Sequence, residues 1–110
     1  MKVEEKGHTI TLKDTQENAE AFLMKVTHEH KTFRNHNLIL DITQDVGVTA
    51  KSLVKFVPLS KEHKKGKKSF VIVASNIDFT AAPASLTVVP SVLEAHDIIE
   101  MEEIERDLGF

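Results

Sequence analysis

Three histidines lie close together in the sequence: His28 and His30 flank Glu29, and His36 follows six residues after the second of them. Imidazole nitrogen is a common zinc ligand, and two histidines separated by one residue can converge on a metal from a loop or strand. The pair also falls at the expected C-terminal end of a helix, where the helix dipole stabilises charged histidine. We therefore interpret these side chains as surface histidines and expect no metal and no cofactor.

A second cluster is basic and lies around Gly66. Lysine side chains can contact phosphate groups, each as a point charge. No arginine or aromatic residue is interleaved with these lysines, and the acidic C-terminal segment opposes broad nucleic-acid binding. We interpret the cluster as a solvated helix end and turn, and expect no nucleic-acid partner. Its members are Lys61, Lys64, Lys65, Lys67 and Lys68.

The C-terminal segment is rich in carboxylates, which in pairs can act as general acids and bases. Glu100, Glu103 and Asp107 can line one helical face, which is more simply a solvated face. Arg106 can pair locally with Glu102 or Glu103. There is no cysteine, which excludes disulfides, thiolate metal sites and cysteine nucleophiles. We expect no catalytic residue and no enzymatic activity.

The stretch from residue 37 to residue 53 is the one around which we expect the fold to be organised. The apolar run Leu38–Ile42 predicts a strand covered on both faces. Asp41 interrupts the run, and because a buried carboxylate must be paired, we expect it to accept N–H groups of the following turn. Asp45 marks that turn. Thr49 can then cap the helix that follows.

Two capping boxes predict the starts of further helices. Asp14 is followed three residues later by Glu17, and Ser91 by Glu94, each before an apolar stripe at helical spacing. Pro58 interrupts the helical pattern that begins near residue 53, because proline lacks an N–H and clashes with the preceding turn.

The predicted elements alternate between strand and helix, which implies a mostly parallel sheet with right-handed crossovers. We expect an α/β fold with a central sheet of four to five strands, flanked by helices, and an N-terminal edge strand or hairpin. Strands are expected at residues 8–12, 38–42, 69–74 and 86–89, with residues 2–5 pairing as a hairpin; helices at 15–28, 53–57, 60–65 and from 91 towards the C-terminus; and a loop with one short helical turn at 75–85.

The composition is that of one ordinary globular domain spanning residues 1–110. Hydrophobic residues make up 41% and charged residues 28% of the chain, and the formal net charge is -3. The N-terminus is too polar for a signal peptide, and no apolar run approaches the roughly 20 residues that a membrane span needs. We expect a cytoplasmic protein without a membrane partner.

This order of elements resembles the STAS family, which includes bacterial anti-sigma factor antagonists. The resemblance rests on three segments and covers nearly the whole chain. The first is the strand that ends in Asp41-Ile42-Thr43. The second is the helical segment from Leu53 through Gly66 to the strand at residues 70–73. The third is the last strand and helix, residues 88–99. The resemblance implies a domain that regulates transcription by binding a partner protein.

In antagonists of this family an Asp-Ser-Ser-Gly motif begins the second helix, and its serine is phosphorylated by a partner kinase. Aligned without gaps, this chain has Ala50 at the phosphoacceptor position, so phosphorylation falls to Thr49 or Ser52. Phosphate at a helix N-terminus suits the helix dipole. The resemblance implies docking of an anti-sigma factor or related kinase, and leaves a homodimer open. The expected partner-binding residues are Asp41, Thr43, Asp45, Val48, Thr49, Ala50, Lys51 and Ser52.

An accessory protein or enzyme of RNA processing is the alternative. The pair His28 and His30 resembles the first two histidines of the His-x-His-x-Asp-His motif in metallo-β-lactamase-type hydrolases such as ribonuclease Z. Here Lys31-Thr32-Phe33 follows instead. Under this alternative, the histidine pair or the lysine cluster at residues 61–68 would carry the function.

Overall fold

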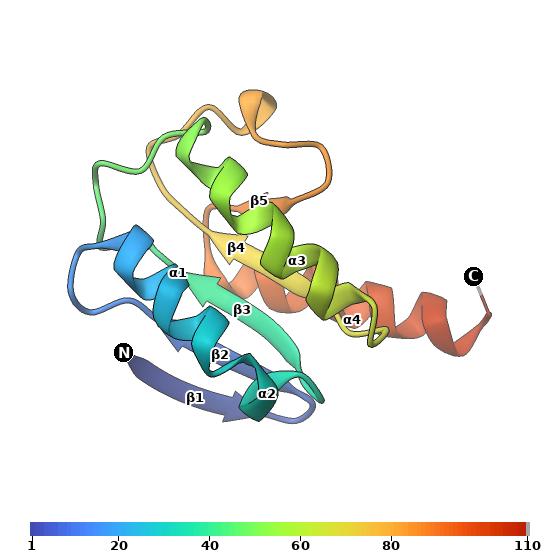
Figure 1. Ribbon diagram of the computed structural model, residues 1–110. Coiled ribbons are helices and arrows are strands. Elements are labelled where there is room, and N and C mark those ends of the chain that lie inside the picture. Colours follow the sequence, from blue (N-terminus) through green and yellow to red (C-terminus); the bar gives the residue numbers. More distant parts are fainter. Residues whose placement is uncertain (110) are drawn as a thin grey trace.

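The centre of the structure, a computed structural model that describes residues 1–109, is a five-stranded sheet whose strands lie side by side in chain order (Figure 1). The first two strands form an antiparallel hairpin, and every later neighbour pairs in parallel. The strands are β1 (Lys2–Lys6), β2 (Thr9–Lys13), β3 (Asn37–Asp41), β4 (Phe70–Val73) and β5 (Thr87–Val89).

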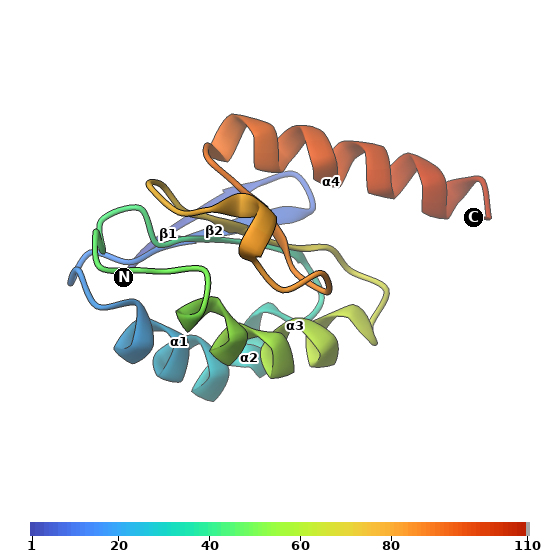
Figure 2. The ribbon, with the colours of Figure 1, turned by 90° about the horizontal axis from the view of Figure 1, so that it is seen from above.

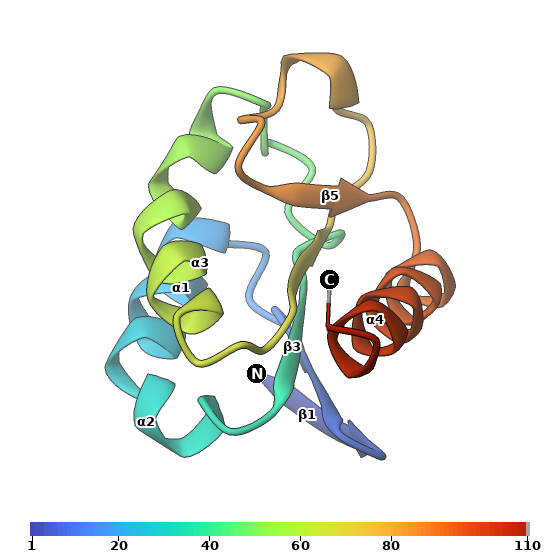
Figure 3. The same cartoon turned by 90° about the vertical axis from the view of Figure 1, so that its right-hand side faces the viewer.

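Helices cover both faces of this sheet, three on one face and one on the other (Figures 2 and 3). Right-handed crossovers between consecutive parallel strands place their connecting helices on one face. The last helix follows β5 and returns across the opposite face. The helices are α1 (Ala19–His28), α2 (His30–Phe33), α3 (Val57–Lys64) and, alone on its face, α4 (Val92–Asp107); two 3₁₀ turns span Ser52–Phe56 and Phe79–Ala81.

The two middle strands are buried on both faces, as their continuous apolar sequences predict. Leu38 and Leu40 of β3 belong to the larger core under α1, α2 and α3. Ile39, between them, packs with Val71 and the α4 residue Ile99 in a smaller core on the other face. The sheet therefore separates two apolar layers, and α4 is held by the smaller one.

The expected start of α1 is wrong by four residues. The helix begins at Ala19, and its N-cap is Asn18, whose side chain accepts a hydrogen bond from the Ala21 N–H at 3.0 Å. Asp14 instead accepts from the backbone N–H groups of Gln16 and Asn18, at 2.9 and 3.0 Å. The carboxylate therefore shapes the turn before the helix instead of capping the helix.

The capping box at Ser91 is confirmed, whereas the break expected between residues 57 and 60 is displaced, because α3 begins at Val57 and contains Pro58. Ser91 caps α4 by accepting from the Glu94 N–H at 3.2 Å, and its hydroxyl donates to the Glu94 carboxylate at 3.2 Å. Pro58 lies in the first turn of α3, where its missing N–H costs little. The segment before it is a 3₁₀ turn, so the chain changes helix type at the proline.

The two outer edges of the sheet differ in character. All five residues of β1 are exposed, and four of them are charged: Lys2, Glu4, Glu5 and Lys6. The opposite edge strand, β5, has only three residues.

The expected α/β architecture, with a mostly parallel sheet and an N-terminal hairpin, is confirmed. Within residues 1–109, none of the helices combines the length and apolar character needed to cross a membrane.

Candidate functional site

The loop between β3 and the 3₁₀ turn at Ser52 lies at the carboxyl edge of the parallel strands, the edge at which open α/β sheets usually bind ligands (Figure 1). Asp41 starts this loop. Its carboxylate accepts hydrogen bonds from the Thr43 N–H at 3.0 Å and the Thr43 hydroxyl at 2.7 Å, as the sequence predicts. Asp41 is only 7% exposed, so it shapes the loop from within.

Asp45 ties the loop to α1. One carboxylate oxygen accepts from the Ala19 N–H at 2.8 Å, and the other accepts from the Gly47 N–H at 2.9 Å. The first contact satisfies an N–H of the first helical turn, where negative charge is favoured by the helix dipole. One side chain thus fixes the loop and completes the start of a helix 26 residues earlier in the chain.

Substituting Asp45→Ala is expected to lower the free energy of unfolding by about 1–2 kcal/mol, because it removes both hydrogen bonds and one helix cap. Urea denaturation measures the loss, with Gln44→Ala, an exposed neighbour in the same loop, as the matched control. Equal stability of the two variants would show that the tie to α1 contributes nothing.

Thr49 and Ser52 bind each other. The Thr49 N–H donates to the Ser52 hydroxyl at 2.9 Å, that hydroxyl donates to the Thr49 carbonyl at 2.8 Å, and the Ser52 N–H lies 3.2 Å from the Thr49 hydroxyl oxygen. Thr49 is exposed, whereas Ser52 is half-buried and uses its hydroxyl in both directions. Of the two, Thr49 is the more accessible to a modifying enzyme.

The predicted partner-binding residues divide by exposure. Thr49 and Lys51 are exposed, Thr43, Asp45, Ala50 and Ser52 are half-buried, and Asp41 and Val48 are buried. A partner could therefore touch the first two directly, while the buried pair supports the loop from below. Asp45, Val48 and Ser52 also line a small hollow of about 190 Å³ between the loop and α1.

Sequence reasoning missed the apolar side chains that this edge exposes. Val46 is 82% exposed, and Val54 is 56% exposed on the 3₁₀ turn that follows. Phe79, 39% exposed, lies in the connection that leaves the same edge after β4. The sequence could have indicated Val46, because it is an apolar residue between Asp45 and Gly47, in a turn where polar residues are favoured.

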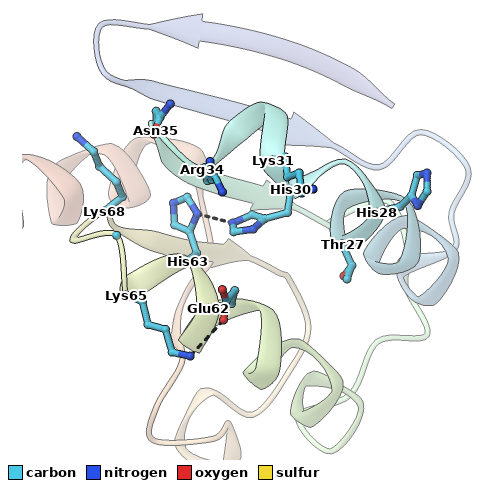
Figure 4. Close-up of a pocket in the computed structure, with 11 residues that line it drawn as sticks. Thr27, His28, His30, Lys31, Arg34, Asn35, Glu62, His63, Lys65 and Lys68 are labelled. Carbon is cyan, nitrogen blue, oxygen red and sulfur yellow. Dashed lines mark hydrogen bonds and ion pairs between the residues drawn. The ribbon is translucent and has the colours of Figure 1, made fainter.

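The second site lies at the opposite, amino edge, where the ends of α2 and α3 enclose a hollow of about 550 Å³ (Figure 4). Histidines and lysines that the sequence treats separately meet there. The His30 Nε2 and His63 Nδ1 atoms are 2.8 Å apart. We call this hollow the basic pocket; it is lined by Thr27, His28, His30, Lys31, Arg34, Asn35, Glu62, His63, Lys65, Gly66 and Lys68.

Two members of these histidine and lysine clusters, His36 and Lys64, do not line the basic pocket. His36 lies apart from the pocket lining, with its Nε2 3.7 Å from the Glu5 carboxylate. Lys64 donates to the Ser85 carbonyl at 3.1 Å. Within residues 1–109, no group of three or more histidine and carboxylate side chains is arranged to hold a metal ion.

The expected local pairing of Arg106 with Glu102 or Glu103 is also wrong. The guanidinium donates to the Ser69 hydroxyl at 3.1 Å and the Asn37 side-chain oxygen at 3.3 Å. Glu103 instead lies 3.3 Å from His8 Nδ1. Arg106 thereby joins α4 to the starts of β3 and β4.

No protein-family model matches the chain, and no curated protein matches it.

Proposed function

We propose that this chain is a non-enzymatic, STAS-like interaction domain, similar to anti-sigma factor antagonists, that docks a regulatory partner through the loop at residues 41–53. The observation that carries the proposal is Val46, an apolar side chain left 82% exposed on a loop that Asp45 fastens to α1. A loop already held in one conformation loses little entropy on binding, which raises affinity.

The surrounding side chains supply the rest of the interface. Lys51 offers a charge for an acidic partner such as an anti-sigma factor or related kinase, and Val54 adds apolar area. Protein interfaces usually combine an apolar core with a polar rim. Phosphate on Thr49 would place negative charge beside Lys51 and so alter the electrostatics of the docking surface.

Val46→Asp tests the proposal. It is expected to weaken capture of the partner from extracts of the native cells by about tenfold or more, because an interface anchor becomes charged. Val3→Asp is the matched control: Val3 is also an exposed valine, 51% accessible, but lies on β1. Both variants should unfold at nearly the same urea concentration as the wild type.

Binding that survives both Val46→Asp and Lys51→Glu would refute docking at this loop. Phosphosite mapping across residues 45–55 of the same native protein tests the switch. Phosphate on Thr49 or Ser52 supports it, whereas an unmodified chain under several growth conditions would leave a constitutive binding domain.

A further inference from the structure

The basic pocket shares no lining residue with the proposed docking loop. Helix α2 and the end of α3, which line the pocket, lie at the other end of the sheet from that loop (Figure 1). Its lining has an excess of positive charge. The lining includes four cationic side chains, Lys31, Arg34, Lys65 and Lys68, and one carboxylate, Glu62. That carboxylate forms an ion pair with Lys65, whose Nζ lies 3.3 Å away.

Three of the cations lack a counter-charge. Within the described residues, no carboxylate lies within 4.0 Å of Lys31, Arg34 or Lys68. A helix C-terminus can stabilise nearby cations, but Lys68 lies four residues beyond the end of α3, and α2, which precedes Arg34, has only four residues. Helix dipoles therefore do not account for the charges of Arg34 and Lys68, whereas Lys31 lies in α2, three residues after the end of α1; an anion would be attracted to the uncompensated charge.

The histidine pair adds a hydrogen-bond donor, His30, whose protonated form an anion would favour. His63 is 1% exposed, and its Nε2 has no hydrogen-bond partner among the described residues. Burial, and then the nearby charge of His30, lower the pKa of His63 to about 4. When His30 is protonated, its Nε2–H donates to His63 Nδ1, and its Nδ1–H remains able to donate to a ligand. Figure 4 shows the two rings pointing toward each other.

We propose that the basic pocket binds the phosphate monoester group of a small molecule, with Arg34 and Lys68 as cationic partners and His30 as a hydrogen-bond donor. Arginine suits this role because its planar fork matches phosphate oxygens in pairs. A volume of about 550 Å³ lies within the range of small-molecule sites.

A nucleic-acid strand fits this surface less well. No phenylalanine lines the pocket, so it lacks the aromatic platform on which bases stack. The neighbouring hollow, which shares Lys68, sets Glu102 and Glu105 among its cations Lys64, Lys67 and Arg106, so a polyanion that continued into it would meet two carboxylates. The net charge of -3 acts in the same direction.

Binding should be linked to pH. Burial first, and then Arg34, lower the pKa of His30, while Glu62 raises it. The other titratable or charged groups around this pocket are His28, Lys31, His63, Lys65 and Lys68. A bound anion favours the protonated form of His30, so it raises the pKa of His30. By linkage, an anion of fixed charge must bind more tightly as the pH falls.

The 110-residue chain is titrated with inorganic phosphate at pH 7.5, and with sulfate between about pH 7.5 and 5.5, while amide and histidine signals are followed by NMR. Sulfate stays a dianion over this range, so any pH dependence belongs to the protein. The expected result is saturable binding with shifts at residues 27–35 and 62–68, tighter sulfate binding at the lower pH, and a raised pKa for His30.

Arg34→Ala and Lys68→Ala should each weaken phosphate binding by about tenfold, the effect of losing one charge-assisted contact. Lys2→Ala, an exposed lysine on β1 outside the pocket lining, should leave it unchanged. Equal effects of Lys2→Ala and Lys68→Ala, or shifts that chloride reproduces at the same ionic strength, would overturn the proposal.

A single-stranded RNA oligonucleotide tests the alternative that the basic pocket binds a nucleic-acid strand. RNA binding that Arg34→Ala and Lys68→Ala abolish, and with which phosphate does not compete, would overturn the small-molecule site in favour of a polymer. Because Val46→Asp tests the docking loop alone, failure of one proposal leaves the other unaffected.

Discussion

Lowering the pH from about 7 to about 4.5 is expected to reduce the free energy of unfolding by about 2 kcal/mol through His63 alone. The side chain is buried in the folded protein, and its pKa falls from 6.5 to about 4. Between pH 6.5 and about 4, His63 is therefore protonated in the unfolded chain but neutral in the folded protein. The stabilisation is fully present above pH 6.5 and is lost as the pH falls towards 4.

Urea denaturation at several pH values measures this slope. His63→Leu should flatten it between about pH 6.5 and 4.5. At neutral pH the stability of the variant should stay within about 1 kcal/mol of the wild type, because it loses the contact with His30 but also a buried nitrogen without a partner. His28→Leu, an exposed histidine on the same pocket, is the matched control and should keep the slope. A His63→Leu protein with the wild-type slope would refute this assignment.

Asn37→Ala is expected to cost about 2–3 kcal/mol. The Asn37 side chain is fully buried at the start of β3, and its oxygen accepts hydrogen bonds from the Ser69 N–H at 2.9 Å and from Arg106 at 3.3 Å. Removing this acceptor leaves the buried Ser69 N–H without a hydrogen-bond partner and takes one hydrogen bond from the Arg106 guanidinium. The same substitution should also loosen α4, because Arg106 holds that helix to the sheet.

The matched control is Asn35→Ala, an exposed asparagine two residues earlier. Thermal unfolding compares the stabilities of the two variants, and hydrogen exchange of α4 amides reports the loosening. If Asn35→Ala and Asn37→Ala unfold at the same temperature, the junction between β3, β4 and α4 carries no special stability.

Much of the fold follows from local pattern. β3 and β4 can be recognised from their own sequences, because strands buried on both faces are apolar throughout. Ser91 and Pro58 act on backbone groups within one turn of themselves, so their effects are also readable along the chain. The sequence misplaces the start of α1 because Asp14 and Asn18 both carry side chains suited to capping a helix. The helix starts after Asn18, where the Ala19 N–H also donates to Asp45, a tertiary contact that the sequence does not reveal.

The two sites differ in how far sequence could lead. The carboxyl-edge loop is continuous in sequence, so its position and the role of Asp41 could be predicted. The basic pocket is not continuous, because His30 meets His63 across 33 residues of sequence. In the sequence His63 is one polar residue in a charged helix, and the packing of α3 beside α2 and over β4 buries it. The same packing turns lysines at a helix end into part of a pocket wall.

The sheet edges bear on how copies of this chain can associate. An unpaired strand is a template for another strand, and alternating exposed charge or a very short edge prevents such pairing. The lysines and glutamates of β1 protect one edge, and the three-residue length of β5 protects the other. Growth of one sheet into the next is thereby disfavoured at high concentration and during folding. Two copies that form a dimer would therefore have to meet through helices or loops, leaving the backbone of the sheet unshared.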